Sequence, residues 1–247
     1  VYSTLVATTY GSTEVKPNLA TKVELTGPTE YTATLKPGLT FVNGHKLTAS
    51  DVKFSFDRQL GIADENGPSS MLYNLASTAA VDDTTVTFTL KSANDVLFPQ
   101  VLTTAAGYIA DEEVFPADKV LDDDAIVAAK PWNGPFTIDS YAKNSLASFS
   151  ANPSYQGLYV PKSKQVTLKY YTDASNLKLD VQQGNIDAVY RTLTIPDLQD
   201  LGTKNDVKVH TGPATASATS CSTSRPSRSA PRRPMRTRPR RSRSGRR

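Results

Sequence analysis

The residue types that most often carry metal or acid-base chemistry are sparse in this chain. Its two histidines are His45, directly after an Asn43-Gly44 turn, and His210. An imidazole at either position would serve as a metal ligand or a general acid-base group. The turn favours a simpler interpretation of His45 as an exposed loop residue, and His210 offers no better signal. The sequence therefore predicts no metal site.

Two runs of acidic residues offer carboxylate oxygens. Asp122-Asp123-Asp124 carries the ligand type that Ca²⁺ prefers. No glycine hinge or following glutamate stands at the spacing of a calcium loop, so we expect a solvated acidic turn. Asp82-Asp83 comes directly before a strand pattern and is also interpreted as a turn.

Motifs of nucleophilic and nucleotide chemistry are missing from the sequence. Serine, histidine and aspartate occur, but not in a G-x-S-x-G setting, and there is neither a P-loop nor a G-x-G-x-x-G. The single cysteine, Cys221, leaves residues 1–213 without a disulfide or a thiolate metal site. We expect no catalytic residue, no cofactor and no enzymatic activity.

Charged residues are distributed unevenly along the chain, and their distribution indicates whether a nucleic-acid partner is expected. The formal net charge is +4, but 11 of the 28 lysines and arginines lie in residues 214–247, which contain none of the 24 acidic residues. Residues 1–213 therefore carry 17 basic and 24 acidic residues, a net charge of −7. An acidic body offers no electrostatic surface for phosphates, so we expect no nucleic-acid partner.

No membrane-spanning or leader segment is predicted. There is no run of about 18 apolar residues, the minimum for a spanning helix. The chain begins at Val1 without a charged and then apolar leader, so we expect any signal peptide to lie upstream or to have been removed.

Strand patterns dominate the first hundred residues. Val1–Val6 is rich in β-forming residues, and Tyr31–Leu35 alternates apolar and polar side chains as a half-buried strand does. Lys36-Pro37-Gly38 predicts a turn, after which Leu39–Phe41 is expected to return as the second strand of a hairpin. Thr85–Leu90 alternates in the same way.

A capping-box motif in its acidic variant, Thr48-Ala49-Ser50-Asp51, predicts the N-terminus of a helix. The helix that follows is expected to place Val52, Phe56 and Leu60 on one apolar face, because they are four residues apart.

The second half of the chain predicts a hairpin followed by a strand–helix–strand unit. The hairpin joins residues 134–138 to Leu146–Ser150. The unit consists of a strand at Gln165–Tyr171, a helix at Ala174–Gln183 ended by Gly184, and a strand at Ile186–Tyr190, which favours a parallel pair. We also expect helices at Leu97–Leu102 and Pro196–Leu201 and a strand at Val207–Val209. The fold class is α/β with many antiparallel hairpins.

Several segments in this order resemble a known family, the peptide/nickel class of ABC-transporter solute-binding proteins (family 5). YTATLKPGLTFVNGHKLTASD at Tyr31–Asp51 resembles the family pattern YTFTLRPGVKFHDGTPLTAEDV. Further matches are YSTLV at Tyr2–Val6, PNLA at Pro17–Ala20, NGPF at Asn133–Phe136, NPSY at Asn152–Tyr155 and GNID at Gly184–Asp187. The matches extend over roughly 210 residues in the family's order and spacing.

The resemblance implies a type II periplasmic-binding fold, with a mixed-sheet lobe and an inserted α+β subdomain. Such proteins bind and do not transform their ligands: two lobes close on the ligand like a hinged clamp. The implied function is capture of di- or oligopeptides outside the cytoplasmic membrane for an ABC permease, by a lipid-anchored monomer. Relatives that take nickel chelates, opines or oligosaccharides leave those ligands open as alternatives.

The resemblance also implies ligand-binding residues. Trp132 precedes Gly134-Pro135 near the expected hinge and cleft floor, where its ring forms either a ligand wall or core packing. Tyr190 and Arg191 follow a strand at its carboxyl end, the end that faces the crevice in open α/β sheets. Arg191 is expected to pair either with a ligand carboxylate or with a surface acid. Tyr108 completes the set.

Residues 214–247, rich in arginine, serine and proline, are interpreted as the disordered product of a shifted reading frame. With permitted synonymous codons, Thr219–Arg247 can be re-read in the neighbouring frame as YLVFNFKTQPFGAKTPDADPAKALAVRQA, which resembles the family's next segment. Residues 1–213 would then be a partial solute-binding domain without its second lobe. The alternatives are a natural low-complexity tail and a basic arm that binds nucleic acid.

Overall fold

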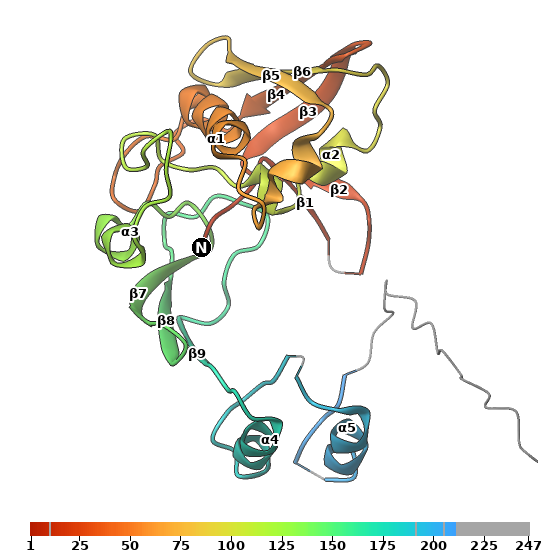
Figure 1. Ribbon diagram of the computed structural model, residues 1–247, viewed down its shortest axis with the longest axis vertical. Coiled ribbons are helices and arrows are strands. Elements are labelled where there is room, and N and C mark those ends of the chain that lie inside the picture. The colour runs from red at the N-terminus through yellow and green to blue at the C-terminus, as the bar shows by residue number, and fades with distance from the viewer. Residues whose placement is uncertain (10, 191, 205, 211–247) are drawn as a thin grey trace, which may run out of the picture. The chain divides into compact units, whose positions relative to one another are not determined.

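The computed structural model describes residues 1–9, 11–190, 192–204 and 206–210 (Figure 1). Contacts divide the chain into two compact units, Val1–Asp180 and Val181–Arg247, which are described separately. Arg191 and the expectations for residues 214–247 lie outside the described residues. Within the described residues, the longest helix has 14 residues, and none is long and apolar enough to cross a membrane.

The centre of the first unit is a four-stranded antiparallel sheet. Its strand order is β3 (Ala20–Gly27), β4 (Glu30–Leu35), β6 (Thr85–Leu90) and β5 (Leu75–Ala80). The alternation expected for β4 and β6 is confirmed, because every second side chain of each strand is buried. These buried side chains are Tyr31, Ala33, Leu35, Val86, Phe88 and Leu90.

Helix α1 (Ala49–Ile62) packs against this sheet (Figure 1). Its capping box is confirmed: the Thr48 side chain caps the helix, and Asp51 accepts a hydrogen bond from the Thr48 backbone N–H at 2.8 Å. Phe56 is fully buried and meets Phe88 edge to face, with ring centroids 5.1 Å apart. The expectation that Leu60 shares this buried face is wrong, since Leu60 is 36% exposed.

The hairpin expected within Tyr31–Phe41 is wrong. Strand β4 pairs with β3 and β6, so both of its edges are occupied. The turn at Gly38, with φ of +70°, instead directs the chain to an isolated bridge between Thr40 and Lys46. Strand β3 was not foreseen, because its exposed lysine, glutamate and threonine side chains give it no continuous apolar face.

The first residues of the chain do not form the strand expected at Val1–Val6. Strand β1 begins only at Val6 (Val6–Thr8) and pairs with β2 (Val15–Pro17). The preceding residues bond to distant segments through buried Asn18, whose Nδ2 donates to Ser3 Oγ and Thr4 O, both at 2.8 Å. Asn18 Oδ1 accepts from the Leu158 N–H at 2.8 Å.

A second, three-stranded antiparallel sheet contains β7 (Phe136–Ala142), β8 (Leu146–Ala151) and β9 (Gln165–Lys169). The expected hairpin of β7 and β8 is confirmed. Asp122–Asp124 is solvent-exposed as expected, but it is not a turn: Asp122 caps helix α3 (Asp123–Ala129) by accepting from the Asp124 N–H. Asp residues are favoured at a helix N-terminus because they satisfy its free N–H groups.

Short helical segments connect these elements. They are η1 (Pro68–Leu72), α2 (Phe98–Val101) and η2 (Ala105–Gly107), of which α2 confirms the helix expected at Leu97–Leu102. Gly107 is required in η2, because a Cβ at this position would lie 2.1 Å from the Leu102 carbonyl oxygen.

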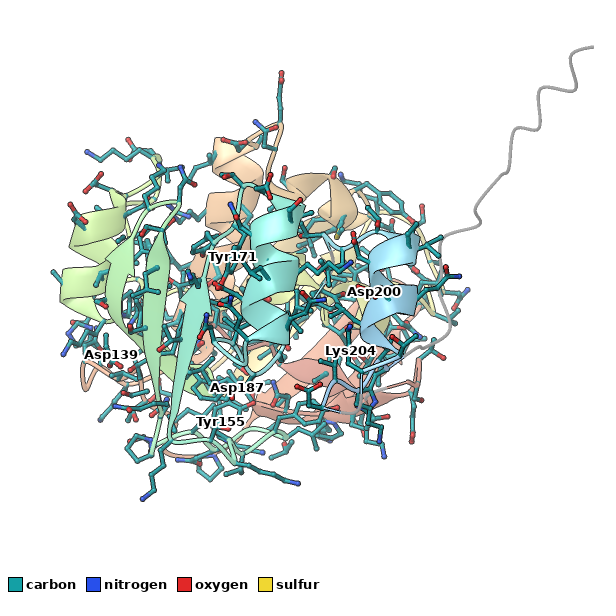
Figure 2. All side chains as sticks on the ribbon, turned by 90° about the horizontal axis from the view of Figure 1, so that it is seen from below. Asp139, Tyr155, Tyr171, Asp187, Asp200 and Lys204 are labelled. Carbon is teal, nitrogen blue, oxygen red and sulfur yellow. The ribbon has the colours of Figure 1, made fainter. Side chains whose placement is uncertain are left out.

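Helix α4 (Ala174–Gln182) confirms the helix expected after β9 and crosses the boundary between the units. Tyr171, labelled in Figure 2, and Lys169 both donate hydrogen bonds to Asp180 of this helix. Gly184, with φ of +69°, follows the helix as expected. In the second unit, α5 (Ile195–Leu201) confirms the predicted helix and is capped by Thr194.

The expected strand–helix–strand crossover is not formed among the described residues. Neither Ile186–Tyr190 nor Val207–Val209 is a strand there, and every described strand pair is antiparallel. A β-forming sequence becomes a strand only when a partner satisfies its backbone groups. The described sheets do not include either of these two segments. The α/β class itself is confirmed.

Replacing Asn18 with alanine should lower the free energy of unfolding by about 3 kcal/mol, since it leaves several buried backbone and hydroxyl groups without partners. Chemical denaturation of the purified chain measures this change. Asn176→Ala, on the exposed surface of α4, is the matched control and should stay within about 0.5 kcal/mol of the parent. Equal effects of the two substitutions would contradict the role assigned to Asn18.

The turn before β6 makes stability depend on pH. Asp82 Oδ1 accepts from the Thr84 N–H at 2.8 Å and the Thr85 N–H at 2.9 Å, and the Thr84 backbone bond is the largest cause that lowers the Asp82 pKa. Its stabilising effect is therefore complete above the ordinary aspartate pKa and lost as the pH falls through the lowered value.

Asp82→Ala should accordingly be less stable than the parent at neutral pH, with a difference that shrinks as the solution is acidified below about pH 4. Thermal unfolding across this pH range measures the difference. Ser163→Ala, at an exposed position, should follow the parent at every pH. A gap between Asp82→Ala and the parent that is constant with pH would show that the carboxylate charge is not involved.

Candidate functional site

Two of the expected site residues are brought together by the ring of Tyr2. Its centroid lies 5.3 Å from that of Trp132, 6.1 Å from that of Tyr108 and 6.4 Å from that of Phe115. We call these four residues the aromatic cluster. Burial raises the pKa of Tyr2, so its phenol stays neutral at physiological pH.

The members of the aromatic cluster differ in how much of each side chain is exposed to solvent. Trp132 is 1% exposed, so its ring packs inside the first unit, and its role toward a ligand remains a prediction. Its indole N–H has no hydrogen-bond partner among the described residues. Tyr108 is 45% exposed and directly follows η2. Tyr108 is therefore the most exposed ring of the aromatic cluster, and Trp132 is the most buried.

Buried Asn133 fixes the backbone on which the aromatic cluster stands. Its Oδ1 accepts from the Ser3 N–H at 2.8 Å, and its Nδ2 donates to the Ile109 carbonyl at 3.1 Å. The next residue, Gly134, donates its N–H to the Val1 carbonyl at 2.7 Å. A Cβ on Gly134 would lie 2.4 Å from that oxygen, so only glycine permits this approach.

The two remaining site residues lie beyond the first unit. Tyr190 belongs to the second unit and is 82% exposed. Arg191 lies outside the described residues. The roles expected for both remain predictions.

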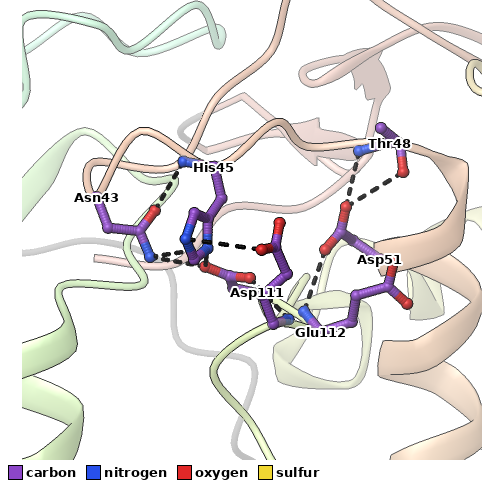
Figure 3. Close-up of polar contacts among 7 residues, drawn as sticks. Asn43, His45, Thr48, Asp51, Asp111 and Glu112 are labelled. Carbon is purple, nitrogen blue, oxygen red and sulfur yellow. Dashed lines mark hydrogen bonds and ion pairs between the residues drawn. The ribbon is translucent and has the colours of Figure 1, made fainter.

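Sequence reasoning missed a polar cluster around His45, which Figure 3 shows. His45 is not a free loop residue: its Nδ1 lies 2.8 Å from Oδ2 of fully buried Asp111, and this hydrogen bond is the main cause that raises the His45 pKa. Asn43 Nδ2 donates to the same oxygen at 2.7 Å, and Glu113 Oε2 lies 3.8 Å from His45 Nε2. The partners are 66 and 68 residues away in the sequence, so spacing gave no signal.

Asp51 links this polar cluster to helix α1. Its Oδ1 accepts from the Glu112 N–H at 3.1 Å, while its Oδ2 serves the capping box (Figure 3). Burial is the largest cause that raises the pKa of Asp51. Of the described residues, His45, Asp111 and Glu113 form the one group whose ligand atoms lie close enough together to hold a metal ion.

Comparison with known proteins shows which family the chain resembles in sequence and fold. The family model described as bacterial extracellular solute-binding proteins, family 5 Middle, matches residues 14–225. The chain is 30% identical over 201 residues to the probable D,D-dipeptide-binding periplasmic protein DdpA of Escherichia coli (strain K12), covering 81% of this chain and 38% of DdpA.

Two further relatives agree. The dipeptide-binding protein of Lactococcus lactis subsp. cremoris (strain MG1363) is 28% identical over 200 residues, covering 71% of this chain and 35% of that protein. The crystal structure of a putative peptide binding protein AppA from Clostridium difficile has the same fold, with a TM-score of 0.69 at 21% identity, covering 83% of this chain and 42% of AppA. The chain thus spans less than half the length of these relatives. It belongs to the bacterial extracellular solute-binding proteins of family 5.

Proposed function

We propose that this chain is part of a solute-binding protein that captures di- or oligopeptides outside the cytoplasmic membrane and delivers them to an ABC permease. The observation that carries the proposal is the family match over residues 14–225, together with two relatives named for dipeptides. The protein acts by binding: it would be a lipid-anchored monomer without catalytic residues or a cofactor. Relatives of other specificity keep nickel chelates, opines and oligosaccharides as alternative ligands.

Tyr108 is the residue of this chain that we propose as a direct ligand contact. Its ring is exposed, yet its position is restrained, because the Ile109 N–H donates to the Ser3 carbonyl at 3.2 Å and the Tyr108 ring lies 6.1 Å from the ring of Tyr2, which in turn meets Trp132. A fixed, half-exposed aromatic ring binds peptide side chains at low entropic cost. Tyr190 and Arg191 are proposed as further contacts, the latter with a ligand carboxylate.

The two-lobed clamp is a proposal for a longer protein, because the chain spans 38% and 35% of its two curated relatives. We propose that residues 214–247 are read out of frame and that the gene continues the family pattern downstream. The genomic sequence across codons 205–247, with about a kilobase beyond, is the test. An open neighbouring frame that encodes the pattern supports this reading, and its absence overturns it while leaving the family assignment intact.

We expect the 247-residue chain alone to bind dipeptides more weakly than the product of the restored frame, because ligand affinity in a hinged clamp depends on contacts in the closed, two-lobed state. Isothermal titration calorimetry of both proteins with a dipeptide mixture measures the difference. Equally tight binding by both would show that the first 210 residues hold a complete binding site.

In the restored protein, Tyr108→Ala should weaken peptide binding by about tenfold, the loss typical of one aromatic contact. Tyr73→Ala is the matched control, because Tyr73 is 72% exposed and lies outside the aromatic cluster. Tryptophan fluorescence or calorimetry measures both affinities. If the two variants bind alike, the site does not include Tyr108.

A further inference from the structure

The two ring nitrogens of His45 face two different carboxylates. Nδ1 lies 2.8 Å from Asp111 Oδ2, and Nε2 lies 3.8 Å from Glu113 Oε2. Buried Asp111 acts only as an acceptor: Oδ2 also takes a hydrogen bond from Asn43 Nδ2, and Oδ1 takes one from the Glu113 N–H at 3.0 Å. With Asp111 accepting these two hydrogen bonds, the hydrogen of the third, between Asp111 Oδ2 and His45 Nδ1, is assigned to Nδ1. In the neutral imidazole, Nε2 is then left with a free lone pair.

This is the arrangement in which proteins hold a metal-binding histidine. A ligating imidazole usually donates its other N–H to a carboxylate, which fixes the tautomer and the ring orientation. The 3.8 Å separation between Nε2 and the Glu113 oxygen is close to the gap that one cation spans at roughly 2.0–2.2 Å from each. His45 and Glu113 side chains are 36% and 64% exposed, so water can fill the other coordination positions.

Both ligands stand on restrained loops. His45 is held at the Asn43-Gly44 turn, where its N–H donates to Asn43 Oδ1 at 3.1 Å and its carbonyl accepts from the Phe41 N–H at 2.9 Å. On the other side, the Glu112 N–H is bonded to Asp51 of helix α1. The ligand atoms therefore face each other without requiring a rearrangement of the backbone.

We propose that His45 Nε2 and the Glu113 carboxylate bind a divalent transition-metal ion of the nickel, copper or zinc type, with Asp111 as the positioning residue. The ligand pair selects this class, because imidazole suits nickel, copper and zinc, whereas Mg²⁺ and Ca²⁺ take oxygen ligands. The site is independent of the proposed function, since none of its residues belongs to the aromatic cluster.

The test is calorimetric titration of the untagged 247-residue chain with Ni²⁺ alone. The parent carries Cys221→Ser, so that no thiol competes for the metal. We expect the parent to bind one Ni²⁺ per chain. The affinity for Ni²⁺ should fall by about tenfold or more in His45→Gln and by about tenfold in Glu113→Gln. His210→Gln, which removes the other imidazole of the chain, is the matched control and should bind as the parent does.

Because His45→Gln removes a hydrogen bond to a buried carboxylate, thermal unfolding must show that this variant is folded. If His45→Gln is not folded, Glu113→Gln still decides the test, because it changes only an exposed side chain. Unchanged Ni²⁺ binding in Glu113→Gln, a loss confined to His210→Gln, equal binding of Mg²⁺, or no binding by the parent at millimolar Ni²⁺ would each overturn the proposal.

The positioning role of Asp111 has its own readout. Asp111→Asn should weaken Ni²⁺ binding by roughly 10- to 100-fold, as loss of an outer-shell partner does. In the metal-free parent at alkaline pH, where the imidazole is neutral, ¹⁵N chemical shifts should show the His45 tautomer protonated at Nδ1, and the variant should lose this preference. A variant that binds weakly but retains the Nδ1–H tautomer would show that Asp111 acts only on folding.

Discussion

Three buried asparagines satisfy backbone groups where the chain crosses itself without regular secondary structure. Asn18 bonds to the Thr4 carbonyl and the Leu158 N–H, Asn133 to the Ser3 N–H and the Ile109 carbonyl, and Asn152 donates to the Gly134 carbonyl at 2.9 Å. A buried backbone group left unpaired costs as much as a lost hydrogen bond. The asparagine amide can both donate and accept, so one side chain joins two segments. The bonds of Asn133 join the backbone beside Tyr2, Tyr108 and Trp132 of the aromatic cluster.

The segment from Ala105 to Phe115 links the two regions of chemical interest. Tyr108 carries the exposed ring of the aromatic cluster, and Asp111 and Glu113 face His45 a few residues later. The loop is anchored to helix α1, because the Ala110 N–H donates to Ser55 Oγ at 2.7 Å and the Glu112 N–H to Asp51. A loop held by a rigid helix is the usual place for binding residues in a folded domain.

The motifs that resemble the family are mainly structural, which explains why they identified the family but not the ligand. Asn18 of the PNLA motif, Asn133 of NGPF and Asn152 of NPSY are all buried and hydrogen-bonded within the protein. In the motif at Tyr31–Asp51, Phe41 is core and Asp51 caps a helix. Residues fixed by packing are shared by proteins that bind different ligands on one fold.

The sequence by itself determined the elements whose signals are local. Side-chain alternation predicts β4 and β6, the capping box predicts the start of α1, and the β7–β8 hairpin follows from neighbouring strands. Only the tertiary structure decided which strands pair, and it placed β3 where a return at Leu39–Phe41 was expected. The tertiary structure also determined which side chains meet at each site. The ring of Tyr2 lies near those of Tyr108 and Trp132, which come from two distant segments, and His45 bonds to distant Asp111. Periodicity records which face of an element is apolar, but a strand partner or a buried charge partner is chosen by long-range packing, which spacing along the chain does not encode.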